Sequence, residues 1–350
     1  MAIVSETPSN QVSPWHGPLV SICIPTYNRA DLITTAIESA LSQSYRNIEV
    51  LVVDNASTDS TNKVIARYND ERLRYVKNEK NLGLFGNFNR CIELAGGKYI
   101  HILHSDDCID RKFTETCVDF LEAHPDVAMT FGSVEPFVNS GERKNRQSSP
   151  PVIYPVPEGF RKTLEARNFI SCPTVMMRKD VYDSYGYYSL EYPYSGDFYH
   201  WLRITRHFSV ASVPDARLYY RTGDHSESFL LLFKTPLGYI DMIKIYVRII
   251  DELGEDRRFY QRELNAACQR HMRDCLFAGI ARYESMTGYS SLIFIGFALS
   301  MWSLMKPQSV SEWINKTGNF FLISAIACLT LVPGGQYITR KIFRLDTKGY

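Results

Sequence analysis

The chain has 350 residues, 45% of them hydrophobic, with 39 lysine and arginine residues against 38 aspartate and glutamate residues. This length allows one large domain or two smaller ones with sizeable cores. The balanced charge excludes a general polyanion-binding role, so we expect no nucleic acid partner. The eight cysteines include no CxxC pair, and residues 1–17 lack a secretory signal, which favours reduced cysteines in the cytosol.

Strands and helices alternate over the first 105 residues. Apolar, β-branched runs predict strands at 19–25, 48–53, 73–76 and 99–103, and helical periodicity marks the segments between them. This alternation indicates an α/β fold with a parallel, doubly wound sheet and helices on its faces. Ligands on such sheets bind at the carboxyl ends of the strands. Residues 1–17, rich in serine, proline and asparagine, are expected to form a flexible lead-in.

Polar side chains follow three of these strands at the point where each strand ends. They are Thr26, Tyr27, Asn28 and Arg29, then Asp54 and Asn55, and finally His104, Ser105, Asp106 and Asp107. Three such groups at one edge of a sheet predict a ligand site, and adjacent carboxylates suit Mg²⁺ or Mn²⁺. A turn or helix N-cap is the alternative for the last group. The chain has no glycine fingerprint after its first strand and no GxxxxGK[ST] loop, so side chains and metal would have to hold a nucleotide.

Ordered motifs across about residues 19–230 resemble the large inverting family of nucleotide-sugar glycosyltransferases, family two, with the GT-A fold. The motifs are VSICIPTYNRADLITTAIESALSQSYRNIEVLVVDNASTDST, NEKNLGLFGNFNRCIELAGGKYIHILHSDD, NFISCPTVMMRKDVY and SGDFYHWLRI. The resemblance implies a Rossmann-like, mostly parallel sheet flanked by helices. It also implies an enzyme of the type that builds bacterial surface polysaccharides.

The strand ends and the resemblance together give a candidate donor-binding set. Its members are Pro25, Thr26, Tyr27, Arg29, Asp54, Asn81, Gly83, Asn89, Ser105, Asp106 and Arg221. By resemblance, Asp54 accepts a hydrogen bond from the base, and Asp106 binds a divalent metal, Mn²⁺ or Mg²⁺, that clamps the diphosphate. Asp107 and His225 complete the candidate metal ligands, although a lone histidine is more often structural. The family's usual Asp-x-Asp reads His104-Ser105-Asp106 here, which leaves the ribose contact and metal dependence open.

The resemblance places Asp197 at the position of the catalytic base, with Gly196-Asp197 where Glu-Asp is commonest. The chemistry fits independently, because an inverting transfer is one in-line displacement during which the acceptor hydroxyl must lose its proton. An N-cap for the helix predicted at 198–206 is the alternative, and both roles are compatible. Trp201 on that helix is expected to pack in the core. Arg178 follows the strand predicted at 174–177, either as a functional basic residue or as a surface charge.

Two further segments carry expectations of their own. Residues 136–157 are rich in proline and lack apolar periodicity, which predicts a mobile loop that orders over donor or acceptor. Residues 216–220 predict a short strand before Arg221.

The C-terminal third has a helical pattern. Residues 239–253 and 259–283 carry apolar side chains every three or four positions. Residues 285–305 and 317–339 contain no charged residue, and a basic end follows from Arg340. Three arrangements stay open: interfacial or re-entrant helices on the inner membrane surface, a transmembrane hairpin, or helices buried against the catalytic domain or a second subunit. Packing against a second subunit would make the protein a homodimer.

The sequence therefore predicts a flexible lead-in (1–17), a GT-A domain (18–230, with donor half 18–110 and acceptor half 111–230) and a helical, membrane-associating region (231–350). The expected activity moves a sugar from a nucleotide-diphosphate donor, a UDP-sugar ahead of dTDP-rhamnose or a GDP-sugar, to a glycan or lipid-linked acceptor. The expected location is the cytoplasmic face of the inner membrane. A polyprenyl-phosphate sugar synthase and a catalytically inactive sugar-nucleotide-binding or scaffold subunit are the alternatives.

Overall fold

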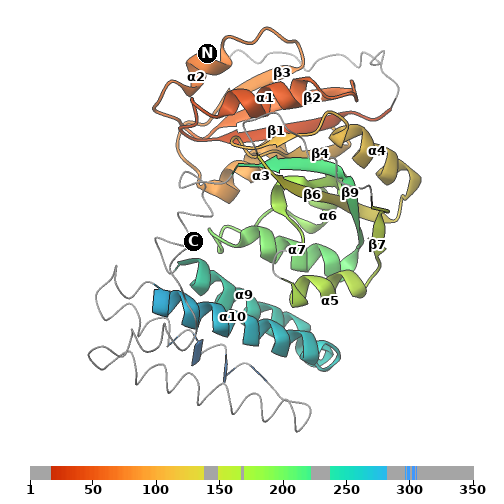
Figure 1. The fold of residues 1–350 in the computed structure, drawn as a ribbon, viewed down its shortest axis with the longest axis vertical. Coiled ribbons are helices and arrows are strands. Elements are labelled where there is room, and N and C mark those ends of the chain that lie inside the picture. The colour runs from red at the N-terminus through yellow and green to blue at the C-terminus, as the bar shows by residue number, and fades with distance from the viewer. Residues whose placement is uncertain are drawn as a thin grey trace, which may run out of the picture. The chain divides into compact units, whose positions relative to one another are not determined.

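The computed structural model describes residues 17–137, 149–166, 169–221 and 237–281, together with six positions between 296 and 305. The chain divides into two compact units (Figure 1). The first comprises Met1–Pro155, Ile170–Tyr188 and Phe208–Thr222, and the second comprises Val156–Phe169, Ser189–His207 and Gly223–Tyr350.

Within the described residues, the first unit contains a nine-stranded sheet of order β3-β2-β1-β4-β8-β6-β9-β5, with β7 paired to β9 (Figure 1). The strands are β1 (Val20–Thr26), β2 (Ile48–Asp54), β3 (Leu73–Lys77), β4 (Tyr99–Ile102), β5 (Cys108–Ile109), β6 (Val127–Pro136), β7 (Val152–Tyr154), β8 (Val175–Arg178) and β9 (Ser209–Tyr220).

The sheet is parallel in its N-terminal half and mixed beyond it. β1 pairs in parallel with β2 and β4, and β2 pairs in parallel with β3, as predicted. β8 then runs antiparallel to both β4 and β6, and β5 and β7 run antiparallel to β9. β6 and β9 run parallel to each other. The predicted mostly parallel sheet is therefore present in part: its N-terminal half is parallel, and it is mixed beyond β4. The regular strand–helix alternation that supplies parallel crossovers stops there, so the sequence carries no signal for the direction of the later strands.

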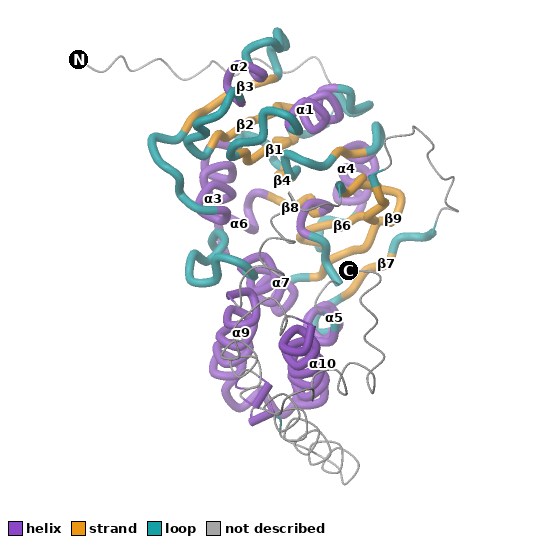
Figure 2. The backbone as a smooth tube through the Cα atoms, turned by 60° about the vertical axis from the view of Figure 1, so that its left-hand side comes forward, coloured by secondary structure: helices purple, strands orange, loops and turns teal. Residues whose placement is uncertain are grey.

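Helices cover both faces of the parallel half. They are α1 (Ile33–Leu41), α2 (Thr61–Ile65), α3 (Leu84–Leu94) and α4 (Phe113–Ala123), with α6 (Lys179–Tyr185) and the 3₁₀ helix η1 (Cys172–Thr174) further along the chain. Successive strand residues point to opposite faces. Ile22 and Ile24 on β1 share a core with α1 and α4, whereas the neighbouring Cys23 contacts the carbonyl oxygen of Cys91 on α3. Figure 2 shows α1 and α4 on one side of β1 and α3 on the other.

A glycine allows β6 and β9 to approach closely. Their register shifts between Phe131 and Ser133, and an added Cβ on the intervening Gly132 would lie 1.8 Å from the carbonyl oxygen of Ala216. Glycine in a strand often marks such a bulge. The Ser133 hydroxyl donates to the carbonyl oxygen of Pro214 at 2.8 Å within the same irregular stretch. β9 runs from Ser209 to Tyr220, so it includes the strand predicted at 216–220 and begins earlier in the chain.

The proline-rich stretch 136–157 is partly strand. Val152–Tyr154 forms β7, which pairs antiparallel with β9, so the loop prediction is wrong for these residues. β-branched and aromatic side chains favour a strand, and the flanking Pro151 and Pro155 bound it without interrupting its hydrogen bonds. Residues 138–148 lie outside the described part of the chain.

The second unit is helical in its described residues. Its helices are α5 (Glu158–Glu165), α7 (Gly196–His207), α9 (Leu237–Leu253) and α10 (Gln261–Ala281), with the 3₁₀ helix η2 (Gly254–Tyr260) between the last two. Their apolar faces form one core, which includes Phe160, Phe198, Leu202, Tyr246 and Met272. The sequence boundary at residue 230 leaves α5 and α7 in the GT-A domain, whereas packing groups them with α9 and α10. The domain division stays a prediction.

Among the described residues, no helix combines the length and apolar character that a membrane span requires. The uncharged run 317–339, the basic end from Arg340 and most of 285–305 lie outside the described residues, as does the lead-in up to residue 16. Membrane association of this region stays a prediction.

Candidate active site

The carboxyl ends of β1 and β2 lie side by side, with Thr26 opposite Asp54 in the register. Pro25 is buried within β1 opposite Val53. Thr26 is 2% exposed, and its hydroxyl oxygen has no hydrogen-bond partner among the described residues. This hydroxyl is therefore available to a ligand. The predicted grouping of polar residues at this sheet edge is therefore present.

Asp54 is a buried carboxylate held in one orientation. Its Oδ1 accepts a hydrogen bond from the Ser57 amide at 2.7 Å, and its Oδ2 accepts one from the Tyr75 hydroxyl at 2.7 Å. Burial and the bond to Asp54 raise the pKa of Tyr75, so the hydroxyl stays protonated and donates. Each carboxylate oxygen has a second lone pair, so Asp54 can still accept from a ligand.

The loops after β1 and β2 are tied together by Asn28, which has a positive φ of 52°. Its side-chain oxygen accepts from the Thr58 amide at 2.8 Å, and the next amide, of Arg29, donates to the Thr61 hydroxyl at 3.1 Å. These bonds present the Tyr27 ring at the surface, where it is 44% exposed. An exposed aromatic ring on a fixed loop provides a flat stacking surface.

The loop before α3 is fastened to the end of β2 by Asn55. The Asn55 amide donates to the side-chain oxygen of Asn81 at 2.9 Å and to the carbonyl oxygen of Gly83 at 3.1 Å. Its own oxygen accepts from the Leu82 amide at 2.8 Å. Gly83 has a positive φ of 77°, which favours glycine at this turn. The structure thus brings the predicted Asn81 and Gly83 next to the strand-end residues.

The side-chain amide of Asn89 makes two hydrogen bonds to the backbone of one residue, Tyr188. It donates to the carbonyl oxygen of Tyr188 and accepts from the Tyr188 amide, each at 2.9 Å. Asn89 therefore joins α3 to the segment after α6. Its predicted contact with the donor stays a prediction.

His104, Asp106 and Asp107 converge in the turn after β4. One ligand atom from each of the three lies within 4.8 Å of the others. Asp107 is fully buried: its Oδ1 accepts from the Arg221 amide at 2.9 Å, and its Oδ2 has no hydrogen-bond partner among the described residues. That Oδ2 lies 3.8 Å from His104 Nδ1. The predicted Ser105 is buried in the same turn.

The electrostatics of this turn favour a bound cation. Burial and the charge of Asp106 raise the pKa of Asp107 to about 8, and burial lowers the pKa of His104. Without a cation, both groups are neutral at pH 7, so their 3.8 Å contact is not an ion pair. Two carboxylates and an unprotonated imidazole are ligands for a divalent ion. The residues present therefore fit a divalent metal.

Arg221 reaches the same turn from the end of β9, and its predicted place near the diphosphate stays a prediction. Its side-chain Nε donates to the carbonyl oxygen of Asp106 at 3.1 Å, and its guanidinium lies 4.0 Å from the centre of the Phe137 ring. Arg221 therefore brings a positive charge to the carboxylates. The other predicted residue of this segment, His225, lies outside the described residues, and its role as a metal ligand stays a prediction.

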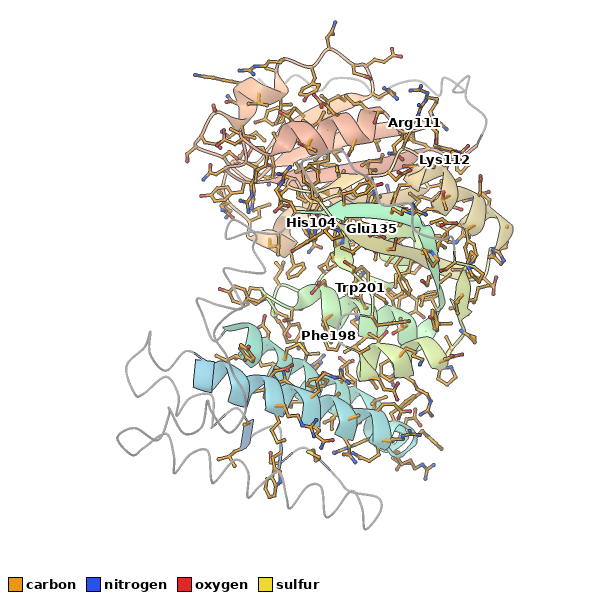
Figure 3. All side chains as sticks on the ribbon, in the orientation of Figure 1. His104, Arg111, Lys112, Glu135, Phe198 and Trp201 are labelled. Carbon is orange, nitrogen blue, oxygen red and sulfur yellow. The ribbon has the colours of Figure 1, made fainter. Side chains whose placement is uncertain are left out.

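Asp197 lies in the first turn of α7, in the second unit, and is half-buried. Its Oδ1 accepts a hydrogen bond from the Phe198 amide at 2.8 Å. Because α7 begins at Gly196, Asp197 lies inside the helix and the N-cap alternative is wrong, whereas its catalytic role stays a prediction. Trp201 on the same helix is 1% exposed, which confirms its predicted place in the core. Figure 3 shows Phe198 and Trp201 on α7.

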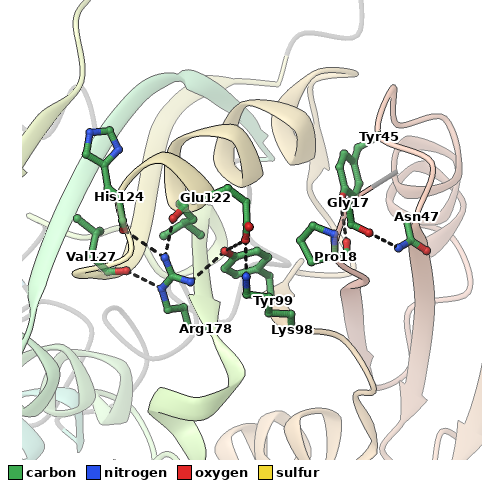
Figure 4. Close-up of polar contacts among 11 residues, drawn as sticks. Gly17, Pro18, Tyr45, Asn47, Lys98, Tyr99, Glu122, His124, Val127 and Arg178 are labelled. Carbon is green, nitrogen blue, oxygen red and sulfur yellow. Dashed lines mark hydrogen bonds and ion pairs between the residues drawn. The ribbon is translucent and has the colours of Figure 1, made fainter. Parts of the chain in front are cut away.

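Arg178 is a structural residue. Its guanidinium donates to the carbonyl oxygens of Leu121, His124 and Val127 at 2.6, 3.2 and 2.8 Å, where α4 ends (Figure 4). It also donates to the Tyr99 hydroxyl at 3.0 Å. A cation at the carboxyl end of a helix satisfies its free carbonyl groups and complements its dipole. This residue is therefore not a surface charge.

Two contributions to the site escaped the sequence reasoning. Tyr75 donates to Asp54 from a neighbouring strand, 21 positions away, and no local pattern signals such a contact. His104 replaces the first acid of the family's motif, and an imidazole beside two carboxylates is itself a metal-ligand pattern.

Comparison with known proteins gives the family. The family model described as Glycosyl transferase family 2 matches residues 21–186. An uncharacterized glycosyltransferase of Haemophilus influenzae is 28% identical over 326 residues, which cover 87% of this chain and 99% of the relative. The UDP-Glc:alpha-D-GlcNAc-diphosphoundecaprenol beta-1,3-glucosyltransferase WfaP of Escherichia coli is 34% identical over 191 residues, which cover 53% of this chain and 70% of the relative.

Among solved structures, S. aureus TarS 1-349 in complex with UDP-GlcNAc superposes with a TM-score of 0.59 at 19% identity, covering 87% of this chain and 90% of the TarS 1-349 chain. At that identity the likeness shows the fold, an α/β, GT-A-like mixed sheet with flanking helices. The sequence comparisons and the fold agree with the motifs at the strand ends. The chain belongs to glycosyl transferase family 2 and is a glycosyltransferase.

Proposed function

We propose that this enzyme transfers a sugar, with inversion, from a UDP-sugar to a hydroxyl of a glycan or lipid-linked acceptor in surface polysaccharide synthesis. The observation that carries the proposal is the convergence of His104, Asp106 and Asp107, with Arg221 beside them, at the carboxyl end of β4. Opposed charges at that edge of an α/β sheet suit a diphosphate and its divalent counter-ion.

Asp54 supports a donor whose base carries an N–H group. The N3–H of uracil donates a hydrogen bond to a carboxylate, and Ser57 and Tyr75 hold that carboxylate in a single orientation. The unpartnered Thr26 hydroxyl and the exposed Tyr27 ring would complete the contact with the nucleoside. Thymine presents the same N–H edge, so dTDP-sugars are the competing donors. The UDP-Glc in the name of the relative WfaP favours uracil.

His104, Asp106 and Asp107 would hold the divalent ion, and Mn²⁺ suits the mixed imidazole and carboxylate set. The ion, when bound, neutralises charge on the diphosphate leaving group. Arg221 fixes the turn by donating to Asp107 and to the carbonyl oxygen of Asp106, and its guanidinium adds positive charge there.

Asp197 would remove the proton from the acceptor hydroxyl as that oxygen attacks the sugar. The Phe198 amide orients its carboxylate at the start of α7. One carboxylate suffices for a single displacement, because no covalent intermediate needs a second group. The WfaP name includes a diphosphoundecaprenol-linked acceptor, which supports a lipid-linked acceptor here and a site at the cytoplasmic membrane surface.

The test is a panel of UDP-, dTDP- and GDP-sugars with a synthetic lipid-diphosphate-linked GlcNAc acceptor, in Mn²⁺, Mg²⁺ or EDTA. We expect metal-dependent turnover of a UDP-sugar, with inversion at the anomeric carbon measured by NMR. The Asp197→Asn variant should bind UDP normally and lose at least about 99% of transfer, whereas Asp183→Asn, at an exposed position, should match the wild type. Retention of configuration, or full activity of Asp197→Asn, would contradict the proposal. Transfer to bare polyprenyl phosphate alone would replace it with the synthase alternative.

A further inference from the structure

The helix that carries Asp197 is capped by a residue from a different helix. The Tyr194 amide donates to Asp241 Oδ2 at 2.8 Å, and the Ser195 backbone makes a second hydrogen bond to the same carboxylate. Both residues directly precede α7, which begins at Gly196. Asp241 belongs to α9, so the contact spans 47 positions of the sequence.

The start of a helix presents backbone N–H groups that need acceptors, and these usually come from the helix's own N-cap side chain. Ser195 stands where such a side chain is expected, but its buried hydroxyl oxygen has no hydrogen-bond partner among the described residues. The Asp241 carboxylate takes the acceptor role instead, and its negative charge complements the positive end of the helix dipole.

The Asp241 side chain is buried, so its carboxylate depends on these backbone hydrogen bonds. The residue is 3% exposed, and a buried carboxylate is stable only when it is hydrogen-bonded. Burial raises its pKa, whereas the bonds from Tyr194 and Ser195 and the charge of Lys244 act in the opposite direction. The carboxylate is therefore fixed to the two amides, and they are fixed to it.

A second contact between the same two helices offers a comparison. Glu252, near the other end of α9, accepts from the Tyr199 hydroxyl at 2.8 Å, and its carbonyl oxygen accepts from Arg206 at 3.2 Å. These bonds join α9 to α7 through side chains of α7. Asp241 instead holds the backbone that leads directly into Asp197.

We propose that Asp241 is a positioning residue for the catalytic base, and that α9 therefore belongs to the catalytic apparatus. The inference rests on the proposed function, because it takes Asp197 as the base. Only Gly196 separates Ser195, the last backbone contact of Asp241, from Asp197, so a shift of this turn moves the Asp197 carboxylate. A misplacement of about 1 Å at a reacting group can lower a rate roughly 100-fold.

The test compares Asp241→Ala, Asp241→Asn and Asp241→Glu with the matched control Glu252→Gln in the full-length enzyme. We expect Asp241→Ala to lower kcat at least about tenfold while the Kd for UDP stays within about twofold of the wild type. The kcat of Asp241→Asn should lie between those of the wild type and Asp241→Ala, because its side chain keeps one acceptor oxygen but carries no charge. Asp241→Glu should recover part of kcat. Glu252→Gln should keep kcat within about twofold, although it also removes the negative charge from a contact between α9 and α7.

A double-mutant cycle separates positioning from general destabilisation. If Asp241 acts through the base, Asp241→Ala should have no further effect on the residual rate of Asp197→Asn. An equal loss in both backgrounds, or an Asp241→Asn enzyme with wild-type kcat, would overturn the inference while leaving the proposed function intact. If Asp197→Asn is itself fully active, the proposed base is wrong and the inference fails with it. If Asp241→Ala does not fold, Asp241→Asn, which keeps the shape of the side chain, decides the question in the same cycle.

Discussion

The metal-free enzyme should lose stability as the pH rises, and Asp107 should be the cause. In the unfolded chain this carboxyl loses its proton near the ordinary pKa of 3.8, whereas burial and Asp106 hold its pKa in the folded state at about 8. Between these values the folded state binds the extra proton, so the free energy of unfolding falls with increasing pH. Within this window the free energy of unfolding falls by about 1.4 kcal/mol for each pH unit, so it falls by roughly 4 kcal/mol between pH 5 and pH 8.

The Asp107→Asn variant isolates this effect. Its amide oxygen can still accept from the Arg221 amide, but the side chain stays neutral at every pH. In urea unfolding in EDTA, the free energy of unfolding of the variant should therefore rise relative to that of the wild type by up to roughly 4 kcal/mol between pH 5 and pH 8. Mn²⁺ should stabilise the wild type at pH 8 and have little effect on the variant, because a cation removes the cost of the buried charge.

The exposed Asp183→Asn variant is the control and should follow the wild type at both pH values. Other titrating groups are common to all three proteins, so they cancel in the differences. Parallel pH dependence of Asp107→Asn and the wild type in EDTA would refute the reasoning, because the buried carboxyl could not then be the group that holds the extra proton.

Three further predictions concern single contacts. Tyr75→Phe removes a hydrogen bond to a buried carboxylate, so urea unfolding should show a loss of about 1.5–3 kcal/mol, and calorimetry should show weaker UDP binding. If UDP affinity is unchanged, Asp54 does not hydrogen-bond to the base. His104→Asp should lower the ratio of Mn²⁺ to Mg²⁺ affinity at least about tenfold, measured by direct metal titration, because imidazole favours transition metals; an unchanged ratio would exclude His104 as a ligand. Gly132→Ala should destabilise the fold by about 3 kcal/mol or more in urea, because its Cβ would overlap the backbone of Ala216. A variant as stable as the wild type would show that β6 and β9 can separate without loss.

The sequence predicts the parallel half of the sheet well because those strands are buried on both faces. Ile22 and Ile24 face α1 while Cys23 faces α3, so β1 reads as an unbroken apolar run that ends at the site. The polar residues at its end, such as Thr26, cannot continue that run. Their positions along the chain therefore predict the edge of the sheet at which they gather.

The rest of the site depends on contacts between distant residues. Asp241 lies on an ordinary amphipathic helix and meets the start of α7 only through the packing of α9. The role of Arg178 is not evident from the sequence, because its three carbonyl partners lie between the end of α4 and the start of β6, more than 50 positions earlier. The sequence does not indicate the direction of β8 either, because an apolar run of four residues suits a parallel or an antiparallel neighbour.

The most direct test of the central claim, that the turn after β4 holds a divalent ion for a nucleotide diphosphate, is calorimetric titration of UDP. We expect UDP to bind the wild type at least about tenfold more tightly in Mn²⁺ than in EDTA, and Asp183→Asn to behave in the same way. This difference should vanish in Asp106→Asn, which lacks one of the three converging ligands. Equal UDP affinity of the wild type in Mn²⁺ and in EDTA would contradict the account.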